Sequence, residues 1–123
     1  MLFVDIFTFN PASENTYLIR NETGETIIID PGCYFTAEQE TLSQFIDNEK
    51  LKPLQLINTH CHPGHIFGNA FIAKKYKLEL YIHALEEKVL EHAPAFSLSL
   101  LGLPVESYKG PLHFLQEGQL ISI

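Results

Sequence analysis

The chain has only two cysteines, Cys33 and Cys61, and they do not form a C-x-x-C pair. Two isolated cysteines cannot provide the disulfide framework of a small secreted domain, so a reducing, cytoplasmic compartment is expected. Long apolar runs are also absent, because the longest, FSLSLLGLPV, is too short to cross a bilayer. The N-terminus, MLFVDIFTFN, has no basic leader and carries Asp5 inside its apolar run, unlike a signal peptide. The sequence therefore predicts no membrane partner.

Positive charge is scarce: 8 lysines and arginines stand against 15 aspartates and glutamates, for a formal net charge of −7. Such a surface repels phosphate backbones, which argues against nucleic-acid binding. A glycine-rich phosphate loop is missing as well, since DPGCYFTAEQ does not match a P-loop. With 123 residues, 46% of them hydrophobic, the chain is expected to form one globular domain over residues 1–123.

Apolar periodicity predicts a mixed α/β fold. Three β-rich segments come first and are separated by turn-forming residues, which predicts an antiparallel start. The third of them, TIIID, is continuously apolar and is expected to be buried on both faces. Helical spacing then alternates with short buried strands, as in α/β folds. The expected strands are residues 2–9, 15–20, 26–30, 54–58 and 78–83, and the expected helices are 36–50, 67–77 and 84–92.

Local signals predict where several of these elements begin and end. Thr36 and Gln39 have the spacing of a capping box at the start of the first helix. Pro94 is expected to end the third helix and to leave residues 94–111 irregular. The segment LHFLQEGQLISI is expected to form two short strands around a turn at Gly118.

Three of the six histidines, His60, His62 and His65, fall within NTHCHPGH, directly after a buried strand. Sites in open α/β sheets form at such strand ends. On an extended segment the rings of His60 and His62 point to the same side, and His65 can fold back toward them. Imidazole is a common zinc ligand. The window therefore predicts a site for one zinc ion, with iron or manganese as alternatives.

The other cysteine and histidine residues favour ordinary roles. Cys61 points away from its neighbouring histidines on an extended segment and is expected to be a small buried residue. Nucleophilic chemistry, with the histidines lowering the pKa of Cys61, is a weaker alternative because no third orienting group is evident. His83, His92 and His113 are expected to be surface or packed residues. A small α/β domain in which the histidines bind no metal is a further alternative.

The motif NTHCHPGH after LQLI resembles the T-H-x-H-x-D-H signature of the metallo-β-lactamase superfamily, and most of all its glyoxalase II-like, or hydroxyacylglutathione hydrolase-like, branch. The segments ENTYLI, TIIIDPG and HPGHIFGNAFIAKKY with LELYIH resemble neighbouring parts of these enzymes, so the resemblance covers essentially the whole chain. It implies the N-terminal half of an αββα sandwich, a mixed sheet with helices on one face. It also implies a zinc-dependent hydrolase of thioesters or esters. His60 and His62 would bind a first metal, His65 a second, and Asp30 would support the metal loop from beneath.

Two departures from the family are visible. Gly64 stands where the signature has aspartate, and Pro63 before it restricts His62 to an extended conformation. The ligands that the family carries in a second half have no counterpart in this sequence. An impaired or inactive hydrolase that holds one ion weakly is therefore expected. The alternative is a non-catalytic metal-binding or dimerising relative that keeps the fold as an interaction module.

Half of a sandwich would leave one sheet face uncovered. The apolar residues of segments 2–9, 26–30 and 54–58 would then form a patch of the kind that marks a partner. Because the two halves of the family fold are related by a pseudo-twofold axis, a homodimer through this exposed sheet face is expected.

Overall fold

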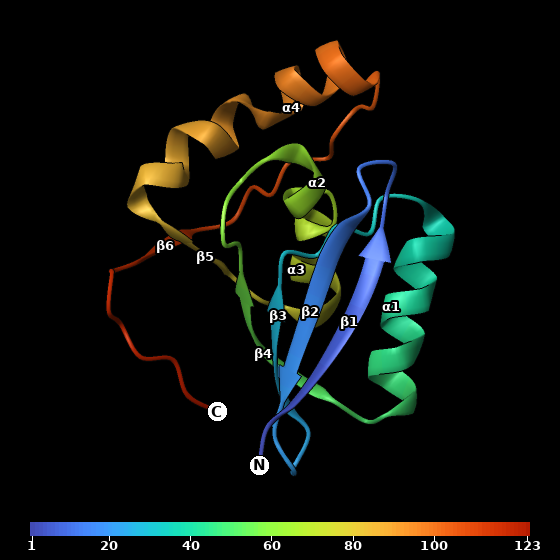
Figure 1. The fold of residues 1–123 in the computed structure, drawn as a ribbon, viewed down its shortest axis with the longest axis vertical. Helices are drawn as coiled ribbons and strands as arrows, with labels where there is room; N and C mark the ends of the chain where they lie inside the picture. The colour runs from blue at the N-terminus through green and yellow to red at the C-terminus, as the bar shows by residue number, and fades with distance from the viewer.

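A computed structural model describes residues 1–123 and contains one six-stranded sheet. The strands lie in the order of the chain, from β1 to β6 (Figure 1). The first three pair in antiparallel fashion, and each later strand pairs in parallel with the one before it. The predicted mixed sheet with an antiparallel start is thereby confirmed. The strands are β1 (Phe3–Phe9), β2 (Glu14–Arg20), β3 (Glu25–Ile29), β4 (Lys52–Ile57), β5 (Leu80–His83) and β6 (Leu112–Leu115).

Helices connect the parallel strands. One joins β3 to β4, two short ones join β4 to β5, and a 3₁₀ turn with a longer helix joins β5 to β6. No helix of the structure is both long and apolar enough to cross a membrane. The helices are α1 (Thr36–Asn48), α2 (Pro63–Ile66), α3 (Asn69–Tyr76), η1 (Ala84–Glu86) and α4 (Glu87–Leu101).

One face of the sheet carries the core. Leu18, Ile28 and Leu56 lie side by side on β2, β3 and β4, and all three are fully buried. Leu42 from α1 and Ile72 from α3 belong to the same buried cluster. The two helices therefore cover this face, and Figure 1 shows α3 behind the strands. The centre of β3 is buried on both faces, as TIIID predicted.

The opposite face is partly open. Val4 and Ile6 of β1 are 57% and 60% exposed. Ile27 and Ile57 on the same side are buried, contrary to the expectation that their segments lie in the exposed patch, and they line a cavity together with the segment 121–123. The uncovered apolar surface is thus concentrated on the first strand.

The expectation that Pro94 ends the third helix is wrong. The helix α4 continues through Pro94 to Leu101. The stop lies at Gly102, which adopts the left-handed conformation with φ 68° and donates its N–H to the Leu98 carbonyl. Ala93 and Ser97 are buried on either side of the proline, so tertiary packing holds the helix where proline alone would break it.

Two further local expectations need correction. Residues 112–115 form β6 and Gly118 forms a turn with φ 80°, but QLISI pairs with no strand and is not one. Helix α1 does not use Thr36 and Gln39 as a capping pair. Phe35 is its N-cap residue, and the Glu38 carboxylate accepts the backbone N–H groups of Tyr34 and Phe35. A carboxylate one position earlier than expected therefore closes this helix end.

Candidate metal centre

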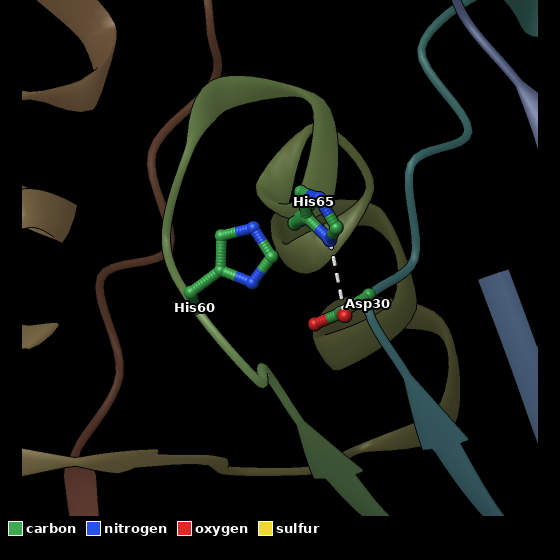
Figure 2. A group of neighbouring side chains, drawn as sticks. All are labelled: Asp30, His60 and His65. Atoms are coloured by element: carbon green, nitrogen blue, oxygen red, sulfur yellow. Dashed lines mark hydrogen bonds and ion pairs between the residues drawn. The ribbon is translucent and has the colours of Figure 1, made fainter. Parts of the chain in front are cut away.

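The carboxyl ends of two neighbouring strands bring Asp30, His60 and His65 together (Figure 2). Asp30 follows β3, His60 lies in the loop after β4, and His65 lies in α2. One potential ligand atom from each residue lies within 4.8 Å of those of the other two. A parallel pair of strands delivers both loops to the same edge of the sheet, which is where sites form in such folds.

Asp30 is held rigidly at the base of this group. Its backbone has φ 54°, in the left-handed region, and its N–H donates to the Ile57 carbonyl at 2.9 Å. The side chain is 2% exposed and accepts hydrogen bonds from the Thr59 N–H, at 2.7 Å, and from the Thr59 hydroxyl. Its Oδ2 also lies 3.0 Å from His65 Nδ1. Asp30 therefore fixes the ring of His65 and the segment 58–65, here called the histidine loop.

The three histidine rings gather on one side of the loop. The ring centroids of His60 and His65 are 3.8 Å apart, and those of His60 and His62 are 4.9 Å apart. His62 is exposed and does not belong to the group of atoms within 4.8 Å. It precedes α2 in an extended conformation with φ −62° and ψ 148°, as Pro63 predicted. The structure thus separates His62 from the tighter pair.

A second acidic residue, Glu14, belongs to this site although the sequence reasoning missed it. Its Oε1 lies 3.1 Å from His65 Nδ1, and the residue is only 6% exposed. The signal was the two-residue period of β2, in which Glu14, Thr16 and Leu18 share the buried face. A glutamate at the start of a strand is expected to face solvent unless the alternation of buried residues is extended to the first residue of the strand.

Burial dominates the electrostatics of the site. Desolvation, reinforced by the nearby Asp30 carboxylate, raises the pKa of Glu14 to about 9. Partial burial, with a smaller effect from the neighbouring His65, lowers the pKa of His60 and favours the neutral ring that binds metals. Burial together with Glu86 raises the pKa of Cys61 to about 12. This direction is opposite to the one that a nucleophilic Cys61 requires.

Polar contacts brace the histidine loop. Asn58 and Asn69, both 1% exposed, exchange two amide hydrogen bonds of 3.1 and 2.7 Å. The Glu86 carboxylate accepts the backbone N–H of Cys61 at 2.8 Å. Cys61 is fully buried, as expected, and both cysteines are free thiols. The loop is therefore anchored from β4, α3 and η1.

The remaining histidines lie outside the group. His83 accepts the N–H of Leu85 at its Nδ1, and His92 lies in α4. His113 stacks on Tyr81 and pairs with Glu79 at 2.7 Å. These are packing and capping roles, in line with expectation.

A cavity of about 560 Å³ opens beside the site. Glu14 and His65 line it on one side, and the apolar side chains of Phe96, Leu100 and Leu101 from α4 line it on the other. This combination of a few polar groups and an apolar wall is typical of small-molecule sites.

Comparison with known proteins agrees with this geometry. The profile of the metallo-beta-lactamase superfamily matches residues 10–122. The chain is 29% identical to the probable metallo-hydrolase YqgX of Bacillus subtilis (strain 168), over 68% of this chain and 37% of that protein. It is 27% identical to the hydroxyacylglutathione hydrolase of Serratia proteamaculans (strain 568), over 92% of this chain and 36% of that protein. The crystal structure of TTHA1623 in a di-iron-bound form superimposes with a TM-score of 0.84 at 29% identity, covering 96% of this chain and 57% of that one.

The fold and the family match together define a mixed-sheet domain of the metallo-hydrolase type. The chain belongs to the metallo-beta-lactamase superfamily, and its similarity is to the glyoxalase II-like branch. It spans a little over a third of the length of the curated relatives and over half of the superimposed structure.

Proposed function

We propose that this chain carries the first metal-binding part of a hydrolase for thioesters or related esters, with His60, His62 and His65 as ligands. The observation that carries the proposal is the convergence of His60 and His65 with Asp30 within 4.8 Å. Neutral imidazoles and buried carboxylates are a suitable donor set for zinc or iron. Iron remains an alternative to zinc because the similar structure of TTHA1623 is in a di-iron-bound form.

Each part of the site would have a separate role in hydrolysis. The Asp30 carboxylate orients His65 and ties the loop to β3 through Thr59. A bound divalent ion would supply an activated water and polarise the scissile carbonyl. The cavity between the site and α4 would receive the acyl part of the substrate, because its α4 wall is apolar. Gly64 offers no side chain for orienting water, so slow turnover by this chain alone is proposed.

The test is the metal content of protein purified without a histidine tag, followed by hydrolysis of a glutathione thioester. Near one equivalent of zinc or iron, with hydrolysis that a chelator abolishes, would support the hydrolase. Metal without turnover would favour the alternative of a non-catalytic metal-binding relative. No metal after zinc and iron have been supplied would contradict the proposal.

We also propose that the open face of the sheet, centred on Val4 and Ile6, mediates a homodimer. The support is the exposure of these two side chains, since exposed apolar surface marks contact sites. Light scattering tests this: a monomer at all concentrations would contradict it, as would a dimer that Val4→Lys with Ile6→Lys leaves intact.

A further inference from the structure

The buried carboxylate of Glu14 has an oxygen that nothing in the fold explains. Oε1 is shielded from solvent and has no hydrogen-bond partner. Its nearest ion-pair neighbour is His65 Nδ1 at 3.1 Å, but that nitrogen also lies 3.0 Å from Asp30 Oδ2, with which it makes its hydrogen bond. One ring nitrogen carries at most one proton, so it cannot satisfy both carboxylates. Buried carboxylate oxygens without partners are strongly disfavoured unless a cation or proton meets them.

The surroundings of Glu14 are shaped around its carboxylate. A Cβ atom at Gly32 would collide with Glu14 Oε2, so the glycine makes the space in which the carboxylate lies. Thr16 places its hydroxyl 3.3 Å from the same oxygen. These contacts hold Oε2 in place and leave Oε1 directed toward His65 and the adjoining cavity.

Two carboxylate oxygens thus lie against one nitrogen of the His65 ring. Asp30 Oδ2 and Glu14 Oε1 lie 3.0 and 3.1 Å from His65 Nδ1. The contact with Asp30 is the hydrogen bond that orients the ring, so the oxygen left without a proton is Glu14 Oε1, beside the histidines.

We propose that Glu14 is a metal ligand of this site, supplied by β2 and acting together with His65. The inference rests on the proposed metal binding and adds a residue that the histidine motif does not contain. The carboxylate reaches the site from the side of Gly64. A Cβ at position 64 would lie 3.5 Å from the Cβ of Glu14, in ordinary contact. Carboxylate side chains at positions 14 and 64 would therefore approach the site from the same side.

The test compares zinc affinity, by competition with a chromophoric chelator, in the wild type and two variants. Glu14→Gln keeps the shape of the side chain and removes its charge. We expect it to weaken zinc binding about tenfold or more, the size of effect that follows the loss of a carboxylate close to a metal. The matched control is Glu38→Gln, because Glu38 is a part-buried carboxylate that only accepts backbone N–H groups of Asn10, Tyr34 and Phe35. It should leave the zinc affinity of the folded protein unchanged.

A third variant makes the result specific to the site. Adding Gly64→Asp to Glu14→Gln returns a carboxylate to the same side and should recover most of the lost affinity. Circular dichroism confirms that each variant is folded before its affinity is measured. Wild-type affinity in folded Glu14→Gln would overturn the role of Glu14 while leaving metal binding by the histidines intact. A double variant as weak as Glu14→Gln would overturn the equivalence of the two positions. Absence of zinc binding in the wild type would overturn the proposed function as well.

Discussion

Residues 1–83 and 84–123 contribute very differently to the molecule. The buried core cluster draws Leu18, Ile28 and Leu56 from the first region, and Ala93 is its sole member from the second. In the second region, helix α4 leaves Leu98 and Leu100 59% and 65% exposed. The first region also holds Glu14, Asp30 and the histidine loop. The comparison shows that one region provides both stability and chemistry, while the other mainly forms one wall of the cavity.

The largest expected effect separates matched leucines of the two regions. Leu56→Ala in β4 removes a fully buried side chain and should lower the free energy of unfolding by about 3 kcal/mol. Leu98→Ala in α4 removes a side chain that is 59% exposed and should change it by less than about 0.5 kcal/mol. Urea unfolding of both variants measures the difference. Equal losses would show that the two regions are equally integral to the core.

The same contrast explains what the sequence could predict. Leu18, Ile28 and Leu56 follow strand periods that the core enforces, so the order of strands and helices in the first region was predictable. The prediction that Pro94 ends the helix failed because packing of Ala93 and Ser97 outweighs the local effect of proline. The prediction of a strand at QLISI failed because a strand needs a partner strand, which no local pattern reveals. In the candidate site, clustering along the chain predicted the three histidines and family resemblance predicted Asp30; the structure brings His60, His65 and Asp30 together. Glu14 could not be found that way, since only folding brings β2 against α2.

The next prediction compares the loss of a buried acidic residue in the first region with the loss of an exposed one in the second. Asp30→Ala leaves the Thr59 N–H and His65 without their buried partner and should lower the free energy of unfolding by about 2 kcal/mol. Glu106→Ala removes an exposed pair with Lys74, 3.6 Å apart, and should have little effect. Both are measured in the presence of a chelator, so that metal binding does not contribute. An unchanged Asp30→Ala variant would contradict the anchoring role of Asp30.

A pH series tests the burial of Glu14 in the metal-free protein. The folded state raises the pKa of this carboxyl from 4.5 to about 9, so between these values the folded chain retains a proton that the unfolded chain has released. Stability contributed by this group is therefore complete below pH 4.5 and falls as pH rises toward 9. Glu14→Gln should flatten that slope in chelator-treated protein. An identical slope in both proteins would show that Glu14 does not titrate in this way.

The smallest expected effect lies in the second region, at Pro94. Proline in a helix interior lacks the N–H that would donate to the carbonyl four residues earlier, at a cost of about 3 kcal/mol relative to alanine. Pro94 also lines a cavity with Ile66 and Leu90, and losing its two ring methylenes removes about 1.6 kcal/mol of apolar burial at most. The helical gain exceeds this loss, so Pro94→Ala should raise the free energy of unfolding by about 1 kcal/mol and increase helicity. Thermal unfolding followed at 222 nm measures both. A destabilised variant would mean that α4 is packed more tightly against the first region than its exposed leucines indicate.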